Sequence, residues 1–131
     1  MFHRDYVIRL LQQFIMMMAK LTGLLEKDDP RVVELELESG FQSFLGLPRH
    51  LAVRMDVNAI LHMLSVTGEL DADRAAMMGL LFRKEAELAR SVSEDEAVIA
   101  SFEDRAMQLI EAALKGRLSE ELRHYLQDAS K

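Results

Sequence analysis

Apolar residues recur every three or four positions from the start of the chain to about residue 27. Within residues 4–27 they form one helical face, made of Val7, Leu10, Phe14, Met17, Leu21 and Leu24. Further apolar residues widen this face, so the polar remainder is only a narrow stripe. A helix with so wide an apolar face must be covered on more than one side. We therefore expect residues 4–27 to be either the central helix of a bundle or half of a dimer seam.

The segment Asp28-Asp29-Pro30 predicts the start of a second helix, which runs to about Gly46. An Asp before a proline is a suitable N-cap, and the missing N–H of proline costs nothing in the first turn. Glu and Leu alternate over residues 34–38 as in a strand, but the longer pattern over residues 32–45 is helical. Pro48 ends the element, because the residue before a proline avoids the α region.

Shorter helices are predicted after residue 49. Asp56 and Asp71 are suitable N-caps, and Ser93 forms a capping box with Glu96, three residues later. Gly116 is expected to end the third of these helices. The predicted ranges are 56–68, 71–90, 93–115 and 119–127. No strand is predicted, so the expected fold class is all-α, a bundle of about five to six helices in one domain over residues 1–131.

Composition narrows the function classes. Half of the 131 residues are hydrophobic, which excludes intrinsic disorder. The chain has no cysteine, so disulfides, zinc–thiolate sites, iron–sulfur clusters and cysteine nucleophiles are impossible. Its net charge of −6 disfavours nucleic acid as a partner, since that affinity depends largely on basic side chains.

The longest uninterrupted apolar run is short. It extends from Phe14 to Ala19, whereas a membrane-spanning helix needs about 20 apolar residues. This run is also too short for the apolar part of a signal peptide. We therefore expect a soluble, cytoplasmic protein with no membrane association.

Two stretches resemble halves of tetratricopeptide-type helical hairpins. The first helix of that repeat is matched by Ala75, Met78, Gly79 and Phe82, where the glycine permits close helix approach and the aromatic fills the gap beside it. The second helix is matched by Leu37, Phe41, Phe44 and Pro48. No repeat period of about 34 residues is visible. The resemblance implies a helical hairpin over residues 4–46 followed by a tetratricopeptide-like helical part over residues 56–127.

The whole chain resembles an uncharacterised family of small all-helical proteins from Gram-positive bacteria. The resemblance is carried by three segments, Asp5-Tyr6, Leu45-Gly46-Leu47 and Gly68-Glu69-Leu70-Asp71. It implies an all-helical fold and no known activity, so it identifies no catalytic residue.

Titratable residues do not form a recognisable metal or catalytic motif. The histidines are His3, His50, His62 and His124, and none stands four residues from another. Glu34 and Glu38 share a helix face one turn apart, a spacing that suits a divalent cation or acid–base chemistry. The one Glu-x-x-His match, Glu121 to His124, lies in a strongly charged run near the end of the chain. We predict surface positions for His62 and His124, and no metal, cofactor or catalytic site.

Two other groups are candidates for binding. Arg49, His50 and Arg54 form a local basic cluster where a small anion could dock, although solvated loop charge is the favoured interpretation. Met17 and Met18 are predicted in the core, whereas Met16 lies close to the polar stripe and is predicted to be exposed.

These observations favour a non-enzymatic interaction or scaffold module. The expected partner is a protein, and a homodimer through the N-terminal helices is the favoured form. The alternative hypothesis is a small-molecule-binding sensor bundle with an enclosed apolar pocket.

Overall fold

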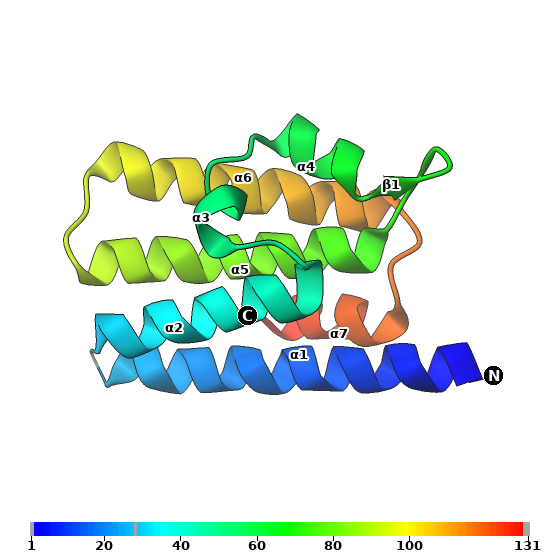
Figure 1. Ribbon diagram of the computed structural model, residues 1–131, viewed down its shortest axis with the longest axis horizontal. Coiled ribbons are helices and arrows are strands. Elements are labelled where there is room, and N and C mark those ends of the chain that lie inside the picture. The colour runs from blue at the N-terminus through cyan, green and yellow to red at the C-terminus, as the bar shows by residue number, and fades with distance from the viewer. Residues whose placement is uncertain (1, 28, 130–131) are drawn as a thin grey trace.

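The protein is an all-α helical bundle, as the sequence predicts. The computed structural model describes residues 2–27 and 29–129, and side chains from Asp5 to Asp128 apart from residue 28 (Figure 1). The elements in chain order are α1 (Phe2–Glu26), α2 (Pro30–Gly40), the π-helical turn η1 (Phe41–Leu45), α3 (Arg49–Ala52), α4 (Val57–Met63), β1 (Ser65–Val66), β2 (Glu69–Leu70), α5 (Ala72–Ser91), α6 (Glu96–Lys115) and α7 (Glu120–Ala129).

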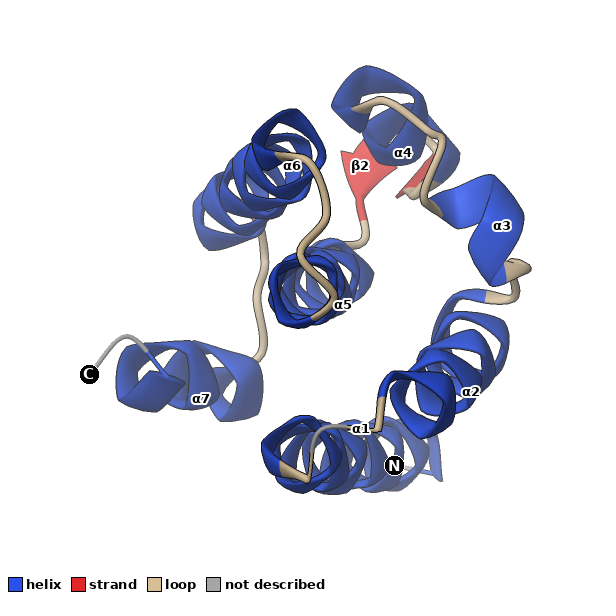
Figure 2. Cartoon of the chain, turned by 90° about the vertical axis from the view of Figure 1, so that its left-hand side faces the viewer, coloured by secondary structure: helices blue, strands red, loops and turns tan. Residues whose placement is uncertain are grey.

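The central helix is α5, and α1 lies at the periphery. Viewed end on, α5 is surrounded by α1, α2, α4, α6 and α7 (Figure 2). Fourteen of its 20 residues are buried, among them every residue of the segment Ala75–Phe82, which is apolar apart from Gly79. The expectation that residues 4–27 form the central helix is therefore wrong. Over Ala75–Phe82, two turns of α5 carry no charged side chain on any side, and a helix segment of this kind must be enclosed.

The length and composition of α1 would also allow it to cross a membrane. The segment Asp5–Glu26 passes this test, although its longest uninterrupted apolar run is only Phe14–Ala19. In the bundle only 28% of its most apolar window is buried. Phe14, Met18 and Leu21 face the shared core, while Lys20 on the polar stripe pairs with Glu36 of α2 at 3.0 Å. These contacts are those of a peripheral helix on a bundle.

Three predicted N-caps are confirmed. The carboxylate of Asp29 accepts a hydrogen bond from the N–H of Val32. Asp56 caps α4 and Asp71 caps α5 in the same way, with N···O distances of 2.7 and 3.2 Å. Each cap satisfies a backbone donor that the helix leaves free. Short polar side chains thus position the starts of α2, α4 and α5.

The predicted capping box at Ser93 is wrong, because Ser93 terminates the preceding helix. Its φ is +56°, and its N–H donates to the carbonyl of Arg90. The N–H of Glu94 donates to the carbonyl of Ala89 at 2.9 Å, which completes a Schellman motif. The N-cap of α6 is Asp95 instead. A serine in the left-handed region therefore takes the place that glycine usually fills.

A short β-hairpin replaces the last residues of the helix that is predicted to begin after Asp56. The helix stops at Met63, and β1 pairs antiparallel with β2. The connecting residues Thr67 and Gly68 have φ of +51° and +82°, as a two-residue hairpin turn of type I′ requires. The prediction of no strand is thus wrong at this turn, although the fold class is unchanged.

Gly79 allows close contact between α5 and α6. A Cβ atom at this position would lie 2.8 Å from Cγ1 of Ile110 and 3.0 Å from the carbonyl oxygen of Ala106. We expect Gly79→Ala to lower the free energy of unfolding by about 1–3 kcal/mol, because the clash with backbone outweighs the helix propensity of alanine. Urea unfolding followed by circular dichroism measures this.

Gly23 provides the matched control within α1. Nothing lies within 4 Å of a Cβ built there. Gly23→Ala should therefore raise the free energy of unfolding by about 0.5–1 kcal/mol, through backbone entropy alone. Equal effects of the two substitutions would contradict the close packing of α5 on α6.

Candidate functional site

An open groove of about 610 Å³ lies between the first half of α1, the start of α5 and the start of α7. In both views α7 lies beside α1, on the same side of α5 (Figures 1 and 2). The floor is apolar and is formed by Tyr6, Val7, Ile8, Leu10, Leu11 and Met77. The rim is polar and is formed by Asp71, Asp73, Arg74, Ser119, Glu120 and Glu121. Residues from three distant parts of the sequence therefore build one site.

The contact between Asp73 and Ser119 fixes the wall of the groove. The carboxylate of Asp73 accepts a hydrogen bond from the backbone N–H of Ser119 at 2.8 Å. The Ser119 hydroxyl in turn accepts from the N–H of Leu122, which makes Ser119 the N-cap of α7. Leu122 and Leu126 are buried in the core, so α7 is held at its start and along one face. The groove is thus a preformed feature of the bundle.

Apolar surface remains uncovered on the groove floor. Tyr6 is 64% exposed, and Val7, Ile8 and Leu10 are only partly buried. Leu11 and Met77, deeper in the groove, are 1% exposed. Partly exposed apolar residues that line one concavity are typical of a binding surface, whereas scattered ones are ordinary.

The rim is acidic. It carries four carboxylates and, among the lining residues, one guanidinium, which pairs with Asp71 at 3.7 Å. The N-termini of α5 and α7 point toward this region and each contribute about half a positive charge. A net charge of about two negative units remains on the rim after both helix dipoles are included.

The predicted basic cluster does not form an anion site around Arg49. The Nε and Nη2 atoms of Arg49 donate to the two carboxylate oxygens of Glu85, at 2.6 and 2.8 Å. These hydrogen bonds raise the pKa of the Arg49 guanidinium above its ordinary value, against the opposing effect of burial. Glu85 is 2% exposed, whereas His50 and Arg54 are exposed. Arg49 therefore acts as the partner of a buried carboxylate, and the cluster is divided.

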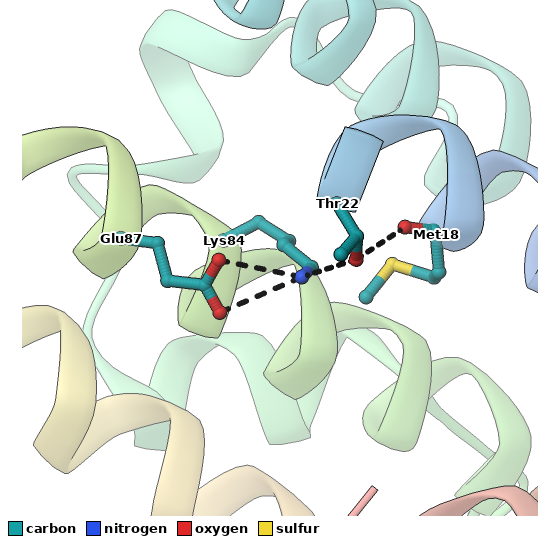
Figure 3. A network of polar contacts seen from close by, with 4 residues as sticks. All are labelled: Met18, Thr22, Lys84 and Glu87. Carbon is teal, nitrogen blue, oxygen red and sulfur yellow. Dashed lines mark hydrogen bonds and ion pairs between the residues drawn. The ribbon is translucent and has the colours of Figure 1, made fainter. Parts of the chain in front are cut away.

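A second buried charge on α5 joins it to α1. The ammonium of Lys84 donates to the hydroxyl of Thr22 at 2.9 Å and lies 3.4 Å from the carboxylate of Glu87 (Figure 3). The Thr22 hydroxyl donates in turn to the carbonyl of Met18 (Figure 3). The hydroxyl, the ammonium and the carboxylate of this network are each engaged within it, so the network orients α1 on α5.

The histidine and glutamate predictions have clear outcomes. His50, His62 and His124 are exposed, as predicted, and the side chain of His3 lies outside the described residues. Glu34 and Glu38 are both exposed. Within the described residues no three His, Asp or Glu side chains gather in a way that could hold a metal ion.

The methionine predictions are confirmed. Met17 and Met18 are buried at 8% and 2% exposure, and Met16 is 72% exposed. Met16 does not line the groove, so the exposed methionine did not indicate where the concave surface lies. No local motif marks the groove either, because its three segments are brought together only by the fold. The wide apolar face of residues 4–27 was the one usable signal.

Comparison with protein-family models, with curated proteins and with solved structures found no match to this chain.

Proposed function

We propose that the protein is a non-enzymatic interaction module that buries the floor of the α1–α5–α7 groove against a helix of another chain. The observation that carries this proposal is the partly uncovered apolar floor formed by Tyr6, Val7, Ile8 and Leu10. An amphipathic helix fills such a groove by laying its apolar face on the floor. The buried charges elsewhere are all engaged in contacts that position helices.

We also propose that the α5–α6 hairpin is tetratricopeptide-like, and two contacts support this. Gly79 allows the backbone of α5 to approach Ala106 of α6, and Phe82 fills the neighbouring space beside Phe102. Helical hairpins of that type are stacked to present extended binding surfaces. In this chain α1 and α7 pack on the hairpin and supply the groove.

A homodimer through α1 is the weaker form of the proposal. A two-fold symmetric interface brings the same patch of both copies together. Two acidic rims would then oppose each other, and the chain already carries a net charge of −6. Like charges across an interface disfavour association. The groove therefore suits a partner of different charge better than a second copy.

Small-molecule binding is the second candidate, because 610 Å³ lies within the usual range of about 300–1,000 Å³ for ligand pockets. Such sites enclose most of the ligand surface, whereas this groove is open. Thermal shift measurements against a metabolite library would favour this candidate if one compound stabilises the protein and Ile8→Glu removes the effect.

Site-specific photo-crosslinking tests the interaction proposal. We expect a benzophenone amino acid at Tyr6 to give a discrete crosslinked product in the native host, because this side chain faces the groove and is 64% exposed. The same probe at Met107, an exposed position on α6, is the control and should not give that product. Adding Ile8→Glu, which places a charge on the floor, should abolish it.

The mass of the product identifies the class of partner. A product of twice the chain mass indicates a second copy, and any other mass indicates a different protein. No product from the Tyr6 position, or the same product from Met107, would overturn the proposal.

A further inference from the structure

We infer that the occupant of the α1–α5–α7 groove is a cationic amphipathic helix from another protein, with an apolar stripe flanked by lysine or arginine. This inference rests on the proposed function and adds the chemistry of the partner. It is carried by the juxtaposition of an apolar floor and an acidic rim in one concavity.

The floor determines the apolar part of the partner. Tyr6, Val7 and Leu10 present uncovered apolar surface along consecutive turns of α1. An apolar stripe with residues at helical spacing matches a surface that is itself a helix face. The partner helix would thus pack along α1 and replace the solvent that now contacts this face.

The acidic rim determines the charge of the residues that flank the apolar stripe of the partner helix. Glu120 and Glu121 are exposed in the first turn of α7, and no ion pair involves either of them within the described residues. The carboxylates of Asp71 and Asp73 accept hydrogen bonds from the backbone N–H groups of Arg74 and Ser119. Basic groups on both sides of an apolar stripe would lie over these carboxylates and gain attraction from them.

The alternative occupants fit these charges less well. A second copy would bring a second acidic rim to the same interface. An anionic lipid surface would meet the same repulsion from the four rim carboxylates. An uncharged apolar helix would fill the floor but leave the rim without a counterpart.

Two helix-stapled peptides of about 15 residues test the inference. Both carry the same leucine and isoleucine stripe, and they differ only in having lysine or glutamate at the flanking positions. Fluorescence anisotropy should show that the lysine peptide binds the full-length protein at least about tenfold more tightly than the glutamate peptide. The preference should shrink between about 50 mM and about 500 mM salt, because the rim is exposed.

Charge reversal at the rim provides the matched comparison. Glu120→Lys/Glu121→Lys should remove the preference for the lysine peptide. Glu94→Lys/Glu96→Lys makes the same change in net charge where α6 begins, at the opposite end of the molecule, and should retain it (Figure 1). If the first variant unfolds, Glu120→Gln/Glu121→Gln should still reduce the preference.

The outcomes separate the two proposals. Equal binding of both peptides, or tighter binding of the glutamate peptide, overturns the cationic partner and leaves the interaction module standing. If neither peptide binds at about 1 mM while Tyr6 still gives a crosslinked product, the cationic helix is again overturned. If the peptides do not bind and no crosslinked product forms, both the interaction module and the cationic partner helix are overturned.

Discussion

Replacing Phe82 with alanine is expected to lower the free energy of unfolding by about 3–5 kcal/mol. Phe82 is fully buried on α5, and its ring lies 6.1 Å from the ring of Phe41 and 5.9 Å from that of Phe102. The Arg105 guanidinium lies over it at 4.8 Å and donates to the carbonyl of Val53 at 2.7 Å. The substitution therefore opens a cavity. It also removes the Phe82 ring over which the Arg105 guanidinium lies.

Urea unfolding followed by circular dichroism measures this effect. Phe82→Leu is the control, because it keeps most of the volume and should cost under about 1.5 kcal/mol. Phe102→Ala should cost less than Phe82→Ala, since Phe102 is only partly buried. A Phe82→Ala protein within about 1 kcal/mol of the wild type would contradict the central position of α5.

Replacing Glu85 with alanine should lower the free energy of unfolding by about 3 kcal/mol, because it leaves the Arg49 guanidinium without its carboxylate. The Arg49 side chain is 23% exposed, so its guanidinium can turn partly toward solvent. The expected loss therefore lies at the lower end of the range for breaking a buried ion pair. The pair joins α3 to α5 across 36 positions of sequence, so we also expect faster amide exchange over residues 49–55.

Two further variants separate the ion pair from ordinary loss of packing. Arg49→Met/Glu85→Met removes both charges and should recover most of the stability. Glu111→Ala, which removes an exposed carboxylate on α6, should change stability by less than about 0.5 kcal/mol. If the double variant is no more stable than Glu85→Ala, the loss is not due to an unpaired charge.

Local sequence signals predicted the helices well. Asp29, Asp56 and Asp71 start helices because their carboxylates accept hydrogen bonds from N–H groups three residues later. These interactions depend on neighbouring residues only. Ser93 was misassigned because the same residue that suits an N-cap also ends α5 in the left-handed region. The choice between the two depends on where α6 packs, which local sequence does not specify.

The identity of the central helix was predicted wrongly for a related reason. The face of α1 is wide, but a wide face does not distinguish a central helix from a peripheral one with an open groove. The segment Ala75–Phe82, which is apolar apart from Gly79, was the better signal for the centre. Arg83, Lys84 and Glu85 interrupt the pattern directly after it. Lys84 and Glu85 are buried only because Thr22 and Arg49 supply partners from distant segments.

Apart from the wide apolar face of residues 4–27, no local pattern predicts the candidate site. Asp73 and Ser119 are 46 positions apart and meet only in the folded chain. Charged residues at helix starts occur in most helical proteins, so Glu120 and Glu121 carry no special signal in the sequence. The uncovered apolar surface of Tyr6 follows from the position of α7, which leaves the first turns of α1 partly open.

Mapping the lysine-flanked peptide on the protein by NMR tests the central claim most directly. The account predicts that the largest amide chemical-shift changes fall on the three segments that line the groove, residues 6–11, 71–77 and 119–121. Saturable changes confined to these segments, absent in Ile8→Glu, would place the partner helix in the groove. Changes centred on the exposed face of α6, or unaltered by Ile8→Glu, would contradict it.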